Sequence, residues 1–184
     1  GRVFERAIGP REPTFRGEGI VVQGLDSTRP WRHQGGRLRA RSLERMREAL
    51  ADAPAGALRV VALHHHLAGA PWRALRKVPL KQRDAVLDAL CAAGADVVLG
   101  GHIHQSTVVR VTDVVAAEGS PGERLVLATA PGFGRPRPHR KGEAHGVHVL
   151  EWDEGTITAT GLAWLASAGG DGRFEETARR TFPR

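Results

Sequence analysis

Two short aliphatic runs that each end in histidine constrain the fold of this chain most strongly. The first reads VVALHHH over 60–66, and the second reads VVLGGHIHQ over 97–105. A segment with helical periodicity separates them, which predicts two buried parallel strands joined by a helical crossover in an α/β fold. Ligands collect at the carboxyl ends of such strands. Five of the nine histidines are therefore predicted to lie at one edge of the sheet.

The chemistry of these histidines favours a metal site. Neutral imidazoles from two neighbouring strand ends form a nitrogen donor set that suits Zn, Fe, Mn or Ni. His102 and His104 are two residues apart, so in an extended segment they face the same way. The preceding Gly100-Gly101 pair allows a tight turn and a close approach of a ligand. A phosphate site, or histidines that only pack or face solvent, are the alternatives.

Composition indicates one globular domain of ordinary character. The 184 residues are 41% hydrophobic and 26% charged, and they contain no apolar run long enough to cross a membrane. The polar start, GRVFER, does not resemble a signal peptide. The single cysteine, Cys91, excludes an internal disulfide framework and fits a reducing compartment. We therefore expect a cytoplasmic protein with no membrane partner.

The net charge of +7 leaves two interpretations open. It favours anionic partners such as nucleotides or phosphoesters, or it reflects a solvated arginine-rich surface, because the arginines are spread along the chain. Arg73, Arg76 and Lys77 follow the first histidine run in a long loop, where they either contact phosphate or carry surface charge.

The first two thirds of the chain predict an alternation of strands and helices. Residues 1–18 are rich in Pro, Gly and Arg and are expected to be irregular, with at most a short strand. After them, periodicity and helix-ending residues predict strands over 19–25, 58–65 and 95–100, and helices over 37–52 and 80–93.

The remaining residues predict strands without intervening helices. Residues 106–115 and 123–130 run apolar or alternate, and 145–152 and 156–163 form a hairpin across Asp153-Glu154-Gly155. These strands suggest an antiparallel sheet. We place the main domain at 19–166 and expect 167–184 to be a flexible basic tail, with a short helix at most.

Several motifs resemble, in order and spacing, the C-terminal part of the calcineurin-like metallophosphoesterases. They are GLDS at 24–27, the helix after it, LHHHL at 63–67 and GGHIHQ at 100–105. Among these enzymes, the class III cyclic-nucleotide phosphodiesterases look most similar. The resemblance implies a β-sandwich flanked by helices, with a parallel βαβ segment followed by antiparallel strands. It also implies two divalent ions, Mn, Fe or Zn, that activate a water for phosphoester hydrolysis.

The resemblance also implies roles for individual histidines. His65 and His102 would bind one metal, His104 would bind the other, and His66 would face substrate. In the family the ligand stands two residues before a proline, and Leu67 occupies the place of that proline here. His64 or His66 is therefore an alternative to His65 as the ligand.

The family's D-x-H, G-D-x-x-D and G-N-H-[DE] motifs are absent from this chain. We therefore expect the chain to be part of a longer phosphoesterase whose N-terminal half supplies the acidic ligands. Alone, the chain is expected to bind one metal or none and to be weakly active or inactive. A catalytically incomplete metal-binding or scaffold module of the same fold is the alternative.

Overall fold

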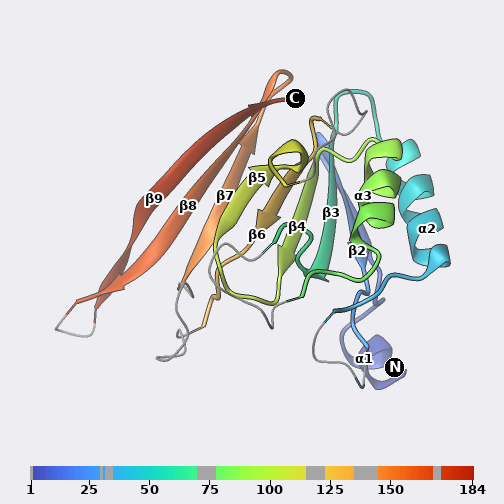
Figure 1. Cartoon of the computed structure of the whole chain (residues 1–184), viewed down its shortest axis with the longest axis horizontal. Coiled ribbons are helices and arrows are strands. Elements are labelled where there is room, and N and C mark those ends of the chain that lie inside the picture. The colour runs from blue at the N-terminus through green and yellow to red at the C-terminus, as the bar shows by residue number, and fades with distance from the viewer. Residues whose placement is uncertain are drawn as a thin grey trace.

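The computed structural model describes residues 2–29, 31, 35–69, 78–114, 123–134, 145–167 and 171–184. Within them the chain forms two sheets and two principal helices (Figure 1). The elements in chain order are α1 (Arg2–Ala7), β1 (Thr14–Gly17), β2 (Ile20–Leu25), α2 (Ala40–Ala51), β3 (Leu58–His65), α3 (Arg83–Ala92), β4 (Val97–Gly101), β5 (Thr107–Arg110), a 3-10 turn (Val111–Asp113), β6 (Val126–Thr129), β7 (Gly146–Trp152), β8 (Thr156–Ala166) and β9 (Gly172–Pro183).

The larger sheet has six strands in the order β1-β2-β3-β4-β6-β5. Strands β2, β3, β4 and β6 are parallel, and the antiparallel strands β1 and β5 lie at the two edges. Strand β3 pairs with β4 as the predicted βαβ unit requires. The carboxyl ends of β2, β3 and β4 consequently meet at one edge of the sheet.

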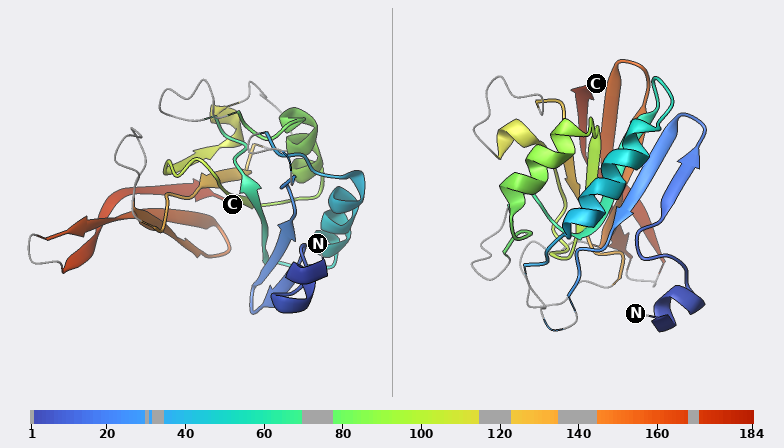
Figure 2. Two further views of the ribbon diagram at one scale, coloured as in Figure 1. Left: turned by 90° about the horizontal axis from the view of Figure 1, so that it is seen from below. Right: turned by 90° about the vertical axis from the view of Figure 1, so that its right-hand side faces the viewer.

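A separate hydrophobic core lies on each face of this sheet. Helices α2 and α3 pack on one face, where Leu50 and Leu90 meet Val61 of β3. On the other face, Val60 of β3 packs against Phe182 of the three-stranded sheet β7-β8-β9. Adjacent residues of β3 point to opposite faces, as the pleat of a strand dictates. The result is a helix, sheet, sheet arrangement of layers (Figures 1 and 2).

Strand β6 differs from the expectation for the second half of the chain. It was expected in an antiparallel sheet, but it extends the parallel sheet beside β4. All four of its residues are buried, which is typical of a parallel strand covered on both faces. The expected hairpin is present as β7 and β8, which pair antiparallel around the turn at 153–155.

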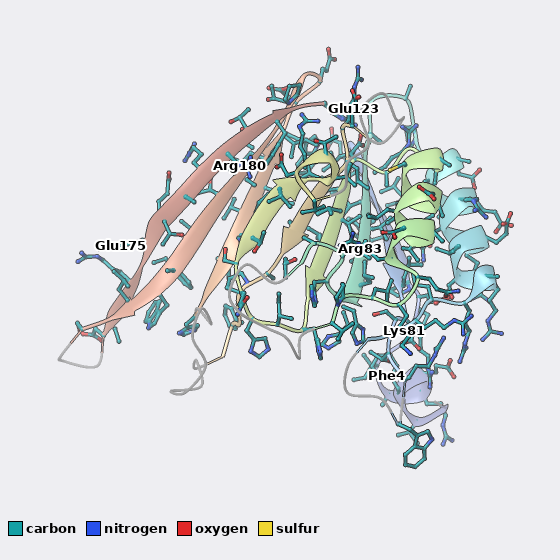
Figure 3. All side chains as sticks on the ribbon, viewed as in Figure 1. Phe4, Lys81, Arg83, Glu123, Glu175 and Arg180 are labelled. Carbon is teal, nitrogen blue, oxygen red and sulfur yellow. The ribbon has the colours of Figure 1, made fainter. Side chains whose placement is uncertain are left out.

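The two ends of the chain are more regular than expected. Residues 1–18 contain α1 and the edge strand β1. The segment expected to be a flexible tail or a helix is instead β9, paired along its length with β8. Charged side chains such as Glu175 and Arg180 lie along this edge strand (Figure 3), where they protect an open edge from further pairing.

Two further expectations concern the basic loop after β3 and membrane-spanning segments. Arg73, Arg76 and Lys77 lie outside the described residues. Among the described residues, no helix has the length and apolar character needed to span a bilayer.

Candidate functional site

The end of β3 carries a bulge that brings successive histidines together. The β3–β4 register shifts between Ala62 and His65, and His65 then pairs with Gly101. In a regular strand His64 and His65 would point to opposite faces. Here their ring centroids are only 5.0 Å apart. Bulges are known to re-aim side chains beside functional sites.

Three imidazole rings meet at this point. The His102 ring lies 4.9 Å from the His64 ring and 4.8 Å from the His65 ring, measured between centroids. His64 Nε2 and His102 Nδ1 are 2.9 Å apart, which is a hydrogen bond. The structure thus brings together histidines from the ends of two adjacent parallel strands. His64, considered only as an alternative ligand in the sequence, is a member of this cluster.

Ser27 fixes the orientation of the His65 ring. Its hydroxyl lies 2.9 Å from His65 Nδ1, and the His65 backbone N–H donates to the same oxygen at 3.3 Å. Gly36 closes over this pair, because a Cβ at position 36 would lie 2.3 Å from His65 Nδ1. His65 is only 2% exposed. When Nδ1 holds its proton toward Ser27, Nε2 is the nitrogen that keeps a lone pair.

His102 and His104 do not continue the strand, contrary to the extended conformation expected from the sequence. Strand β4 ends at Gly101, and the two histidines have φ of 71° and 56°. Left-handed conformations of non-glycine residues are strained and cluster at functional sites. Gly132 lies against His104, since a Cβ there would be 3.3 Å from His104 Cγ.

The pKa values of two members of the cluster, His64 and His65, lie below the ordinary value of histidine. Burial, and then the neighbouring imidazoles of His102, His64 and His66, lowers the pKa of His65 to about 4. Burial and the nearby His104 also lower the pKa of His64. Neutral imidazoles have free lone pairs, so these two shifts favour the protonation state that a metal ligand requires.

His66 occupies a different environment from the three clustered rings. It is fully buried, and its backbone lies against Gly100 of the neighbouring strand, where an added Cβ would be 3.3 Å from His66 Cα. This burial distinguishes His66 from the exposed His64 at the same strand end.

The donor chemistry suits a metal, but the residues do not form a complete metal centre. Among the described residues, no group of three or more His, Cys, Asp or Glu side chains is arranged to hold an ion. One nitrogen of His64 and one of His102 bond to each other. The nearest carboxylate in sequence to Ser27, Asp26, is engaged by Thr28 and Arg11. A binuclear centre therefore does not fit these residues alone.

Comparison with known proteins defines the class of fold. No protein-family model matches this chain, and no curated protein matches it. Solved structures do match, and they show that this chain shares an α/β fold with PhoD.

One of the matching structures is that of PhoD. It superposes with a TM-score of 0.67 at 11% sequence identity, over 92% of this chain and 41% of PhoD. The chain thus spans about two fifths of PhoD. Vps29 from Entamoeba histolytica, wild type and complexed with Zn²⁺, also matches at 12% identity over 85% of this chain and 97% of Vps29. Its TM-score is 0.34, and nothing is inferred from it.

Two features of the site could not be predicted directly from the sequence. Ser27 entered the sequence analysis only as the last residue of the GLDS motif, although it lies two residues after the end of β2 and bonds His65. The proximity of Gly36 to His65 also depends on a loop far from His65 in sequence. The GLDS motif, which precedes α2, is the one local pattern that could have indicated Ser27.

Proposed function

We propose that this chain belongs to a metal-dependent phosphoesterase that hydrolyses phosphoester or phosphodiester bonds at a binuclear metal centre. The observation that carries the proposal is the convergence of three imidazole rings at the ends of adjacent parallel strands, with centroids 4.8 to 5.0 Å apart. The likeness of the fold to that of PhoD supports the class of enzyme.

Within this proposal, His65 and His102 bind one ion and His104 binds the second. The hydrogen bond between His65 Nδ1 and the Ser27 hydroxyl supports the first assignment, because metal-binding histidines are usually oriented through their other nitrogen. His66 is proposed to lie on the substrate side, and His64 is the alternative ligand. When bound, the ions, Mn, Fe or Zn, would polarise the phosphoryl group and activate a water.

The acidic ligands are proposed to come from the N-terminal half of the same protein. Two divalent ions held close together repel each other, and an anionic bridge offsets this repulsion. Imidazoles alone do not provide it. The substrate is a phosphoester, with a nucleotide as one candidate, and the proposed compartment is the cytoplasm, in keeping with the single cysteine.

The test compares this chain with a longer product that includes the coding sequence preceding Gly1. With Mn²⁺ and a generic phosphodiester, we expect background hydrolysis from the 184 residues and turnover from the longer product. His102→Ala should lower that turnover by about 100-fold. His148→Ala, which alters a histidine bonded to Ser106 outside the cluster, is the control.

Either of two results would contradict the proposal. Turnover by the isolated chain that His102→Ala abolishes would mean that the acidic ligands lie within these residues. A longer product with no D-x-H or G-N-H-[DE] motif and no hydrolysis would remove the enzymatic function.

The second candidate is a catalytically incomplete metal-binding or scaffold module. It is favoured by the absence of a metal-holding group among the described residues. Metal stoichiometry of the longer product separates the two candidates. Two ions per chain support the enzyme, and one ion or none supports the module.

A further inference from the structure

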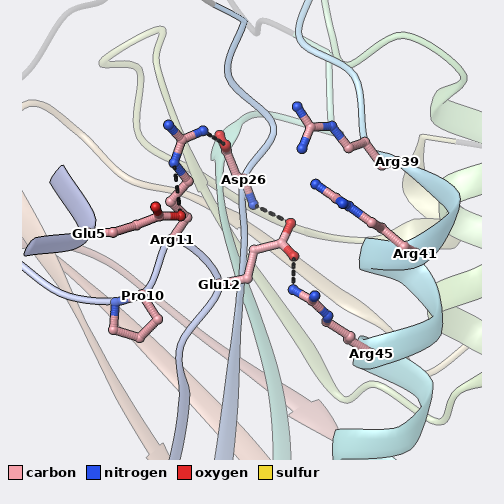
Figure 4. A pocket seen from close by; sticks show the side chains of 8 residues that line it. All are labelled: Glu5, Pro10, Arg11, Glu12, Asp26, Arg39, Arg41 and Arg45. Carbon is pink, nitrogen blue, oxygen red and sulfur yellow. Dashed lines mark hydrogen bonds and ion pairs between the residues drawn. The ribbon is translucent and has the colours of Figure 1, made fainter. Parts of the chain in front are cut away.

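A cavity of about 500 Å³ is lined by none of the clustered histidines and takes no part in the proposed chemistry (Figure 4). It is bounded by α1, the segment that follows α1, the end of β2 and the first half of α2. Pockets that hold small organic ligands span about 300 to 1,000 Å³. Asp26 lines the cavity, and its neighbour Ser27 orients His65, so both sites lie at the same edge of the sheet.

Three carboxylates line the cavity, and each of them already has donors. Arg11 pairs with Glu5 at 3.7 Å and with Asp26 at 3.3 Å. Glu12 accepts from the Ser42 hydroxyl at 2.6 Å, from the Asp26 backbone N–H at 3.2 Å and from Arg45 at 3.4 Å. Apart from the bond from Ser42, which is not drawn, Figure 4 shows these bonds as one connected network.

The network also keeps Asp26 ionised. Burial would raise the pKa of Asp26, but hydrogen bonds from Thr28 and the charge of Arg11 outweigh it and hold this pKa below its ordinary value. Asp26 and Glu12 therefore remain engaged with Arg11 and Arg45. Neither carboxylate is left over to neutralise a further arginine.

Two more arginines line the same cavity, Arg39 and Arg41. Their guanidinium groups extend from the start of α2 toward Asp26 in Figure 4. Within the described part of the chain, neither side chain forms an ion pair or a hydrogen bond. The four arginines and three carboxylates leave an excess of one positive charge, located on this side of the cavity.

Both arginines are solvent-exposed and lie at the N-terminal end of α2. Arg39 is the N-cap of α2 and forms no side-chain cap, and the first turn contains no acidic residue. Cations are disfavoured at a helix N-terminus, which carries partial positive charge. A bound anion would offset this repulsion. Local arrangements that break such rules are expected at functional sites.

We propose that this cavity binds a phosphomonoester, with its doubly charged phosphate held by Arg39 and Arg41. The planar guanidinium group matches phosphate oxygens in a bidentate manner. The cavity is larger than a phosphate group needs, so it accommodates an organic part as well. This site goes beyond the proposed hydrolysis and needs no metal ion.

Calorimetric titration of the chain with phenyl phosphate tests the proposal, at pH 8, fixed ionic strength and with a metal chelator present. We expect saturable binding of one equivalent. The double variant Arg39→Gln/Arg41→Gln should weaken it at least about tenfold, since each charge-assisted bond contributes roughly a factor of ten or more. The matched control is Arg47→Gln on the same helix, where Arg47 pairs with Glu44 at 2.9 Å outside the cavity.

Other arms of the experiment identify the ligand and its location. Weaker binding of inorganic phosphate than of phenyl phosphate supports a phosphomonoester, and equal binding overturns the organic part of the proposal. His102→Ala should leave the affinity unchanged. Loss of binding in His102→Ala would place the phosphate at the histidine cluster. That result, absence of saturable binding, or equal weakening in Arg47→Gln would overturn the proposal without deciding whether the longer protein is a hydrolase.

Discussion

His102 and His104 have backbone conformations that a glycine adopts more easily than a histidine. Their φ values of 71° and 56° lie in the left-handed region, where a Cβ approaches the following carbonyl oxygen. Such strain persists only where the surrounding structure enforces it, and it is concentrated at functional sites. We interpret these strained conformations as lowering the stability of the fold while they hold both imidazoles at the end of β4.

This strain predicts that a glycine variant is more stable than an alanine variant at position 104, which is the reverse of the order expected in a regular strand. At position 104, His104→Gly should be more stable than His104→Ala by about 1 kcal/mol, because only the alanine retains the strained Cβ. At His148, in strand β7, the alanine variant should be the more stable by about 0.5 to 1 kcal/mol. Urea unfolding of all four variants in chelator gives these differences.

Comparing two variants at one position removes the effect of losing the imidazole itself. Equal stability of the alanine and glycine variants at position 104 would show that no strain is stored there.

The gathering of histidines could be predicted from the sequence, but their geometry could not. Aliphatic runs followed by His64 and His102 are local patterns, and parallel strands place their ends at one edge whatever the details. The bulge before His65 and the left-handed turns after Gly101 arise from the pairing of β3 with β4. No residue type in either segment specifies them.

At the scale of elements, β9 shows how tertiary pairing overrides local appearance. Its sequence, GRFEETARRTFP, is charged and lacks a long apolar run, so it resembles a solvated tail. Most of its residues face solvent, and Phe182 alone among the residues of β9 is fully buried in the core against β3. The burial of Phe182 and the backbone pairing with β8 define this strand. Neither can be recognised from a short stretch of sequence.

The two phenylalanines of β9 are therefore expected to contribute differently to the free energy of unfolding. Phe182 is 3% exposed and lies beneath the guanidinium groups of Arg110 and Arg180, at 5.6 and 5.1 Å. Phe182→Ala should lower the free energy of unfolding by about 3 to 5 kcal/mol. Phe174 is 41% exposed and contacts Trp164, so Phe174→Ala should cost only about 0.5 to 1.5 kcal/mol.

Chemical denaturation of both variants provides the comparison. Because both residues lie in the same strand, the change in strand propensity is the same and cancels. Similar losses for the two would mean that β9 is not anchored through Phe182.

At the scale of the whole molecule, the two hydrophobic cores share their central strands. Val60 and Val61 are consecutive in β3, yet one contributes to the core under the three-stranded sheet and the other to the core under the helices. Arg184 adds a link from the C-terminus to Asp96 at 3.4 Å, beside the start of β4. Loss of either core should therefore destabilise the strands that support the other.

This sharing predicts a single cooperative unfolding transition. Far-ultraviolet circular dichroism reports α2 and α3 on one face. In a chain with Trp31 and Trp72 replaced by Phe, the fluorescence of Trp152 and Trp164 reports the small sheet on the other. The two signals should change at the same urea concentration, as in two-state unfolding. Leu50→Ala in one core and Phe182→Ala in the other should both shift the two signals together. If Phe182→Ala shifts the tryptophan signal alone, the small sheet unfolds independently, and only the six-stranded sheet holds the histidine cluster in place.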